Sequence, residues 1–522
     1  MLEEEETFAI MSFFREDYNH MTTHAKIRRT LGRCFGAVLC ISLLLPLHAE
    51  RLSTAWAENA PAAKGPQVLR IGTLYSGEDD TYFRQQFTDL YELQHPDVKL
   101  EIVPAVDQNE LRYQSAAAAA ASDPLEGMRK LIEGDRPVDV IVGDASLLGY
   151  LTEQQLVRPL QPLIDRDGYD LSDMAPSMLE GVKELGKGSL YALAPTFSSS
   201  ALYYNQSLFD DAGVEYPRSG MTWDEVLALA AQVSKPAKDE SKRIYGLSVS
   251  RYANDPYWDM SSWMMPLQLA MYDSTASAMT VNNDSWNKVW TTYSKLVRDG
   301  VVPQASTSIT PQAAASGPIA GDLFLQGRAA MVTAESYYIN ELVEANRHAS
   351  NIKGYKPFEW DVVTMPSFPE QPGVGQGTWI GNLMSVSVNA SNPEGAWDLI
   401  KFVNSREVAR IKAHNRYELT SRTSSISSAE PGLSMEPFYT MKPVPPADPE
   451  LNRLLLTMPG IGQISDAGRL LFNEVCAGRM TVDEALAAWE KQGNHMLLEM
   501  KTDPDKVFDL NDPKAMKEPI RS

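Results

Sequence analysis

The residues of this chain best suited to chemistry are aromatic and short polar side chains, which suit ligand binding better than catalysis. Trp379 lies in the glycine-rich segment GQGTWIG, and Tyr257, Trp258 and Trp263 lie close together in RYANDPYWDMSSW. Aromatic rings offer flat apolar platforms, and short polar groups can hydrogen-bond hydroxyls. Because glycines let a ligand approach the backbone closely, we expect Trp379 to stack on a ligand. Core packing and ligand stacking are equally compatible with Trp258 and Trp263.

Sequence signatures of catalysis and of metal binding are missing. The segment GVGQG (373–377) follows prolines instead of joining a strand to a helix, so it is not a dinucleotide fingerprint. No GxSxG, P-loop or HExxH motif occurs, and the histidines after residue 60 are far apart. We therefore expect no catalytic residue, no metal site and no cofactor.

The elements that would position these residues follow from periodicity. Three early segments read as buried strands: VLRIGTL (68–74), VKLEIV (98–103) and PVDVIVG (137–143). An amphipathic helix is predicted over 79–94, and capping boxes at 222–225 and 481–484 mark further helix starts. Strands and helices alternate over most of the chain, which predicts an α/β fold. Asp144 follows the third strand, where open α/β sheets bind ligands, but it could equally cap the next helix.

Later strands are predicted from shorter apolar runs. They lie near 244–249, 329–333, 360–363 and 383–388.

The first 57 residues have the layout of a secretory signal peptide. A basic stretch (26–33) precedes an apolar run (34–47), and Ala55-Trp56-Ala57 supplies a small-residue cleavage site. The apolar run is shorter than the ~20 residues that span a bilayer. We expect an extracytoplasmic, cell-envelope protein with residues 1–57 removed. An uncleaved membrane anchor is the alternative, and a lipid anchor at Cys40 is disfavoured because no clear lipobox precedes it.

Composition excludes several other classes of protein. The 522 residues contain 43% hydrophobic and 22% charged residues, which is ordinary globular composition. Asp and Glu number 68 against 47 Lys and Arg, for a net charge of -21. Nucleic-acid binding needs clustered basic residues, so we expect no nucleic-acid partner. An acidic protein kept apart by self-repulsion is expected to be a monomer.

Several motifs occur in a fixed order between residues 68 and 500. They are GKGSLYALAPTFSSSALYYNQSLFDDAGV with MTWDE (186–225), FLQGRAAMV (324–332), WDVVTMPSFP (360–369), SNPEGAWDLIKFV (391–403) and AGRMTVDEAL (477–486). In this order they resemble the family 1 extracellular solute-binding proteins, which include maltose- and oligosaccharide-binding proteins and deliver solutes to ABC transporters. The alanine-rich stretch 115–122 and the loop 304–321 depart from the family pattern and are expected to be insertions.

The resemblance implies a periplasmic-binding-protein-like fold, in which crossover strands join two α/β lobes and the ligand cleft lies between them. It assigns residues 66–195 and 379–445 to lobe 1, and 196–378 and 446–522 to lobe 2. Crossovers are expected near 191–200, 375–383 and 441–451. The predicted ligand-binding residues are Trp379, Asp144, Trp258, Tyr75, Asp80, Ser199, Tyr257, Trp263 and Tyr337. Of these, Tyr75 and Tyr337 rest on their position in the family pattern.

The predicted function is therefore capture of a sugar or oligosaccharide and its delivery to an ABC transporter permease. A secreted polysaccharide-active enzyme is the rival reading, since an acidic chain can supply the two carboxylates of a glycosidase. A sensor or adaptor with the same binding fold is the other alternative.

Overall fold

The computed structural model describes most of the chain after residue 66. The described residues are 67–76, 79–113, 123–252, 255–304, 317–415, 417–446, 451, 454, 458–504 and 506–510. The predicted signal peptide, the alanine-rich stretch and most of the loop 304–321 lie outside them. Within the described part, no helix is long and apolar enough to cross a membrane.

One sheet has five strands in the order β2-β1-β3-β9-β4. Strand β1 (Gln67–Ser76) pairs in parallel with β2 (Val98–Asp107) and β3 (Val140–Gly143). Strand β9 (Leu383–Val386) runs antiparallel to β3 and to β4 (Ala192–Leu193). All three early strands that the sequence predicts are present, and β2 extends four residues further than predicted because its pairing with β1 continues to Asp107.

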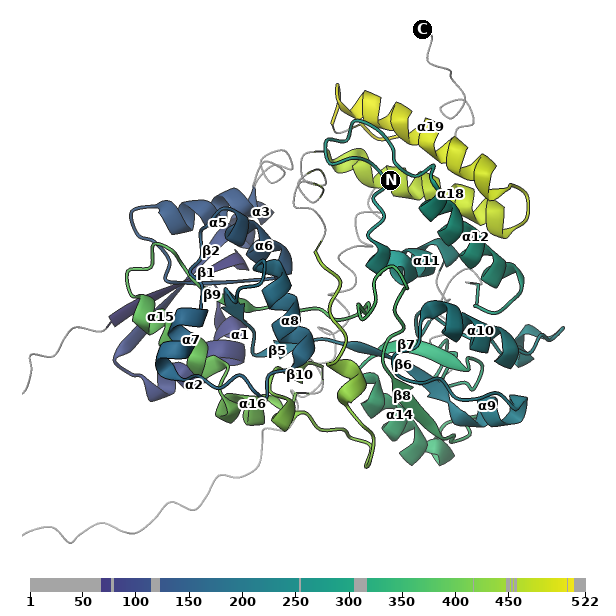
Figure 1. Ribbon diagram of the computed structural model, residues 1–522, viewed down its shortest axis with the longest axis horizontal. Coiled ribbons are helices and arrows are strands. Elements are labelled where there is room, and N and C mark those ends of the chain that lie inside the picture. The colour runs from purple at the N-terminus through teal and green to yellow at the C-terminus, as the bar shows by residue number, and fades with distance from the viewer. Residues whose placement is uncertain are drawn as a thin grey trace, which may run out of the picture. The chain divides into compact units, whose positions relative to one another are not determined.

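Helices cover both faces of this sheet (Figure 1). They include α2 (Asp89–Gln94), α3 (Gln108–Arg112), α5 (Pro124–Glu133), α6 (Ala145–Glu153), α7 (Gln161–Asp167), α8 (Pro176–Leu185), α15 (Pro393–Val403) and α16 (Arg406–Lys412). Alternation along β3 separates the two faces, since Val140 packs with Trp397 of α15 and Ile141 packs with Met128 of α5. The predicted helix over 79–94 is present as α1 (Thr81–Phe83), the π-helical turn η3 (Arg84–Thr88) and α2.

A second, antiparallel sheet has the order β7-β6-β8. Strand β6 (Ser200–Asn205) pairs with β7 (Met331–Glu335) on one side and β8 (Trp360–Val363) on the other. Its alternating residues join different cores, since Leu202 packs in the cluster of Trp223 and Tyr203 packs with Tyr338. Two sheets of this kind, each with its own helices and core, confirm the predicted α/β architecture.

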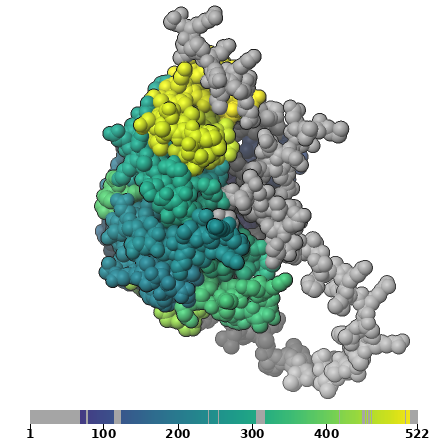
Figure 2. Space-filling view, turned by 90° about the vertical axis from the view of Figure 1, so that its right-hand side faces the viewer, coloured from purple at the N-terminus to yellow at the C-terminus, as the bar shows by residue number. Residues whose placement is uncertain are grey.

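The helices of the second part pack on both faces of this sheet, with Tyr338 of α14 on one face and Trp223 of α10 on the other. They are α9 (Gln206–Ala212), α10 (Trp223–Val233), α11 (Pro256–Met264), α12 (Asp284–Arg298), α14 (Tyr338–Arg347), α18 (Gln463–Cys476) and α19 (Val482–Met500). Figure 2 shows the last two helices, in yellow, continuous with the teal surface of the earlier ones. Both predicted capping boxes are confirmed, because Thr222 with Glu225 and Thr481 with Glu484 satisfy the first turns of α10 and α19.

One predicted strand forms only in part. The segment 244–249 makes isolated parallel bridges to Ala329 and Val332 instead of a continuous strand. Gly246 passes directly against the carbonyl of Ala230 in α10, where a Cβ would lie 1.9 Å from that oxygen. This close approach favours glycine and interrupts the apolar run that predicted the strand.

The chain passes from the first sheet to the second through residues 194–199 and returns through 364–382. Within this passage, β5 (Thr196–Phe197) pairs antiparallel with β10 (Leu419–Thr420). On the other side, the backbones of Ser198 and Trp379 exchange two hydrogen bonds of 3.0 and 2.9 Å. We refer to residues 196–200 with these two neighbours, 377–380 and 417–420, as the crossover ladder. The described part of the third expected crossover, residues 441–446, contacts Gly373, Gly375 and Gln268.

Candidate ligand-binding site

Polar residues gather at the carboxyl edge of the parallel strands in the first sheet. Tyr75 is near the end of β1, opposite Val106, and Asp107 ends β2. Asp144 follows β3 and accepts a hydrogen bond from the Leu147 amide at 3.0 Å, so it does cap α6. Partial burial raises the pKa of Tyr75, and the nearby carboxylates of Asp144 and Asp123 raise it further. Tyr75 and the three aspartates named here therefore share one edge of the sheet, the edge where open α/β sheets bind ligands.

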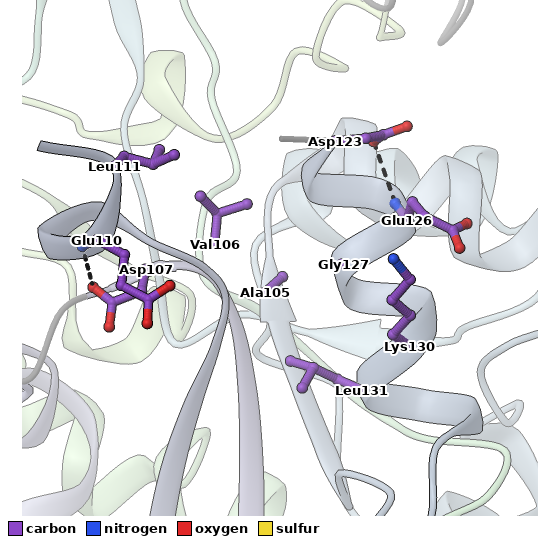
Figure 3. Close-up of a pocket in the computed structure, with 10 residues that line it drawn as sticks. All are labelled: Ala105, Val106, Asp107, Glu110, Leu111, Asp123, Glu126, Gly127, Lys130 and Leu131. Carbon is purple, nitrogen blue, oxygen red and sulfur yellow. Dashed lines mark hydrogen bonds between the residues drawn. The ribbon is translucent and has the colours of Figure 1, made fainter. Parts of the chain in front are cut away.

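A cavity of about 410 Å³ opens beside this edge, between α3 and α5 (Figure 3). Ala105 and Val106 of β2 lie between the two helices. Asp107 and Asp123, the N-caps of α3 and α5, line the cavity with their carboxylates bound to the amides of their own helices. Its other lining residues are Glu110, Leu111, Glu126, Gly127, Lys130 and Leu131. Four carboxylates and one ammonium make the cavity acidic. Among the described residues, however, no group of His, Cys, Asp or Glu is arranged to hold a metal ion.

Trp379 is an exposed aromatic ring fixed on the crossover ladder. Its side chain is 54% exposed although its backbone is paired with Ser198. The indole lies over Gly381, where a Cβ would come within 2.1 Å of the ring. Beside it, the Thr378 and Ser199 hydroxyls are 3.2 Å apart, which places the buried Ser199 side chain away from solvent. The Trp379 ring therefore packs on Gly381 and still exposes about half of its surface, as a stacking platform requires.

Gln376 connects the crossover ladder to α11. Its side chain is buried, and in the amide orientation that satisfies both groups it donates to the carbonyls of Ser262 at 2.8 Å and Trp263 at 3.0 Å. These carbonyls belong to the last turn of α11. The segment that carries Trp379 is therefore fixed against the helix that carries Trp258 and Trp263.

The three aromatic residues of α11 have different environments. Trp263 is only 3% exposed and packs against Trp223, Tyr293 and Phe368. Tyr257 is also buried, and its hydroxyl lies 3.1 Å from that of Ser465.

Trp258 is different, since it is 46% exposed and touches only the edge of the Tyr257 ring among the aromatic residues described. Burial leaves Trp263 and Tyr257 no free ring face, so Trp258 is the one of these three aromatic residues that a ligand can reach.

The remaining predicted residues lie at helix starts. Asp80 accepts a hydrogen bond from Arg84 at 2.9 Å, and Arg84 also binds Glu92 at 2.6 Å, so Asp80 is engaged in a local ion-pair network. Tyr337 lies half-buried just before α14, and its ring centroid is 5.9 Å from that of Tyr417.

Sequence reasoning missed three residues near these sites. Asp107 and Asp123 carry no distinctive signal in the sequence, since acidic residues before a helix are common caps, and both do cap helices here. Tyr417 lies in an irregular segment between α16 and β10, where no periodic pattern or motif marks it. Only the three-dimensional structure locates Tyr417, because the pairing of β10 with β5 brings it to the crossover ladder.

Comparisons with known proteins agree with this architecture. Residues 76–410 match the family described as bacterial extracellular solute-binding protein. A protein of Brucella abortus named a putative binding protein is 25% identical over 349 residues, which are 66% of this chain and 73% of that protein. The mannitol-binding protein of Pseudomonas aeruginosa is 28% identical over 174 residues, which cover 33% of this chain and 35% of its own.

Solved structures share the fold at low sequence identity. The sugar-binding protein MalE from Xanthomonas citri superposes with a TM-score of 0.53 and 17% identity, covering 84% of this chain and 98% of its own. A sugar transporter protein from Rhizobium etli, in an open conformation, gives a TM-score of 0.52 and 17% identity over 82% and 99%. These likenesses confirm the predicted periplasmic-binding-protein-like fold. With well over half of its residues matched, this chain belongs to the bacterial extracellular solute-binding protein family, whose members serve ABC transporters as binding proteins and not as enzymes.

Proposed function

We propose that this protein captures a sugar or oligosaccharide outside the cytoplasm, as a monomer, and delivers it to an ABC transporter permease. The observation that carries the proposal is Trp379, an exposed indole fixed on the crossover ladder. A flat aromatic ring matches the apolar C–H face of a sugar, and burying that face removes apolar surface from water.

The carboxyl edge of the first sheet supplies the polar half of such a site. One oxygen of Asp144 accepts the Leu147 amide, and its other oxygen has no hydrogen bond to a described residue. A carboxylate oxygen of this kind can accept a hydrogen bond from a sugar hydroxyl. Tyr75 lies near Asp144 and is half exposed, so it adds a second ring and a hydroxyl donor.

The known relatives support the ligand class. The Pseudomonas aeruginosa relative is a mannitol-binding protein, and the Xanthomonas citri structure is a sugar-binding protein. Polyols and sugars share the same chemistry, namely many hydroxyls on a short carbon chain or ring.

Thermal-shift and calorimetric titration with mannitol, glucose, maltose and maltotriose test the proposal. A ligand at 100 times its dissociation constant should stabilise the protein by about 2.7 kcal/mol. Trp379→Ala should weaken the binding of whichever of these ligands the wild type binds. If the wild type binds none of them, or if Trp379→Ala binds as well as the wild type, the proposed site is wrong.

A chemical assay separates binding from the enzymatic alternative. Maltotriose recovered after long incubation with the protein should be unchanged. Appearance of shorter sugars would assign hydrolysis to the protein and contradict a role in delivery.

A transport assay separates delivery from a sensor or adaptor role. The purified protein should stimulate uptake of its ligand into vesicles that contain the matching permease. Tight binding without any stimulation would favour the sensor or adaptor.

A further inference from the structure

The side chain of Gln376 is a buried amide that binds the end of helix α11. It is only 7% exposed, and its amide nitrogen donates to the carbonyls of Ser262 at 2.8 Å and Trp263 at 3.0 Å. The Ser262 carbonyl accepts the Met265 amide in a tighter turn, because its usual partner four residues later is Pro266, which has no N–H group. Gln376 therefore completes the end of α11 from a distant segment of the chain.

A neutral amide suits this position for two reasons. Its NH2 group offers two donors in one plane, which matches two neighbouring carbonyl oxygens. It also carries no charge, whereas a lysine or arginine, which often binds a helix end at the surface, would have to be buried here as a cation. The burial of Gln376 leaves its side chain no surface with which to touch a ligand, so its role is to hold the chain.

Glycines on both sides of Gln376 let the backbone lie against two other segments. A Cβ at Gly375 would lie 3.0 Å from the Cβ of Met441. Gly377 has a φ of +88°, and a Cβ there would lie 2.6 Å from the Ser200 side chain. These contacts need glycine, but glycine also gives the backbone many conformations to choose from. The bond from Gln376 to α11 restricts that choice.

The position of Trp379 depends on this stretch, since Gly377 and Thr378 alone separate it from Gln376. The Trp379 backbone pairs with Ser198, and its ring is exposed. The pairing fixes the strand, whereas the bond to α11 fixes the direction from which the chain enters it. A shift of Gln376 should therefore turn the exposed ring without unfolding the crossover ladder.

We propose that Gln376 is a positioning residue, which touches no ligand but fixes its segment to the end of α11 and so holds the Trp379 ring in the orientation that binds one. The same bond makes the ring and the helix end depend on each other. By thermodynamic reciprocity, a ligand on Trp379 should make the last turn of α11 open less often. This inference rests on the proposed function for its ligand, but the bond to α11 is tested without any ligand.

Two substitutions remove the amide in different ways. Gln376→Met keeps the length of the side chain and has no donor. Gln376→Glu keeps the shape, and the introduced carboxyl donates one hydrogen bond when protonated and none when ionised. Gln232→Met is the matched control, because the Gln232 amide is exposed on α10 and donates within its own helix, to the Ala228 carbonyl at 3.2 Å.

Hydrogen exchange of the ligand-free proteins tests the bond itself. Amides within 261–267 and 376–382 should exchange faster in Gln376→Met than in the wild type, because both segments lose a shared anchor. Amides of α15 should not change, and Gln232→Met should match the wild type at all three segments. If Gln376→Met exchanges like the wild type, Gln376 does not hold α11 and the proposal is wrong.

Calorimetric titration with mannitol, glucose, maltose and maltotriose tests the positioning role. For whichever sugar the wild type binds, Gln376→Met should lose about 2- to 10-fold in affinity, the equivalent of one net hydrogen bond, and Gln232→Met should lose nothing. Lowering the pH from 8 to 5 should restore the affinity of Gln376→Glu relative to the wild type. The reason is that a buried carboxyl facing carbonyl oxygens favours its protonated form, which regains a donor. Gln376→Met should show no such recovery.

Exchange in the presence of that sugar separates positioning from stability alone. At equal occupancy, the sugar should slow exchange within 261–267 in the wild type and much less in Gln376→Met. Three results would overturn the positioning role: unchanged affinity in Gln376→Met, equal protection of α11 in both proteins, or no recovery of Gln376→Glu at pH 5. The last comparison decides even if Gln376→Met does not fold.

Failure of the wild type to bind any of the four sugars has a different meaning. It would remove the proposed function and the positioning role together. The ligand-free exchange would still show whether Gln376 holds the end of α11, so the two failures are distinguishable.

Discussion

The crossover ladder and helix α11 both carry aromatic residues, but they are held by different forces. On α11, the buried face of Tyr257, Met260 and Trp263 joins a large apolar core. On the crossover ladder, backbone pairing fixes Trp379 and leaves its ring half exposed. A helix with one apolar face turns aromatic residues inward, whereas an extended segment between glycines has no second face to bury. The difference teaches that, in this chain, the element around an aromatic residue decides whether it stabilises the fold or stays available to a ligand.

The largest effect that would sharpen this comparison is expected at Trp263. Trp263→Ala removes a fully packed indole and should lower the free energy of unfolding by about 3–5 kcal/mol. Trp263→Phe should cost less, because a phenyl ring still fills part of the space and the lost indole N–H has no hydrogen-bond partner among the described residues. Urea denaturation of both variants measures the difference. A Trp263→Ala variant as stable as the wild type would show that α11 does not hold its aromatic residues by burial.

The segment that follows β10, which we call the flank of the crossover ladder, is held by an ion-pair network. We therefore expect acid to lower its stability. Arg422, two residues after β10, is buried and binds Asp173, which also accepts from Arg406 at 2.9 Å. Burial favours the protonated form of Asp173, but hydrogen bonds from Arg406, Ser424 and Arg422 outweigh it and lower its pKa to about 2.

Because the folded-state pKa of Asp173 lies below its unfolded value, the stabilisation is complete above about pH 4 and is lost as pH falls toward 2. The shift from 3.8 to about 2, at about 1.4 kcal/mol per pKa unit, corresponds to about 2.5 kcal/mol. Melting curves at pH 5 and pH 3 should therefore differ more for the wild type than for Asp173→Asn. An identical pH response in the two proteins would show that the network does not hold this flank.

Substitution of Trp379 should affect ligand affinity more than stability, the reverse of what we expect at Trp263. Trp379→Ala should change the melting temperature little, since half of the ring is already in water. It should weaken sugar binding by about 1–3 kcal/mol, the range known for aromatic stacking on other flat ligands. Paired calorimetric titration and thermal melting separate the two effects. A large fall in melting temperature with unchanged affinity would place Trp379 with Trp263 as a core residue and shift attention to Trp258.

The sequence predicted the fold more completely than the site. Apolar periodicity located β1, β2 and β3, and local capping chemistry located α10 and α19, because both signals depend on residues close in sequence. The run 244–249 failed as a strand because Gly246 must pass against α10, a contact between distant segments.

The site depends on contacts of that distant kind. Trp379 was identified because glycines surround it, but nothing local distinguished the exposed Trp258 from the buried Trp263. Tyr417 gave no signal, since it acquires its position only through the pairing of Leu419 with Phe197. The boundaries of the two lobes and the site residues themselves stay predictions that the binding experiments address.

The smallest expected effect tests how the Trp379 ring is held in place. A Cβ at position 381 would lie 2.1 Å from the indole, so Gly381→Ala must displace the ring and not the backbone. Stability should change little because the displaced ring is half exposed. Affinity for sugar should fall, but by less than in Trp379→Ala, because a displaced ring still offers part of its face. Gly149→Ala is the matched control: this glycine lies within α6 with open space at its Cβ position, so alanine there should stabilise the helix by up to about 1 kcal/mol without altering affinity. If Gly381→Ala binds sugar as tightly as the wild type, the orientation of the ring does not matter, and Trp379 contributes apolar area alone.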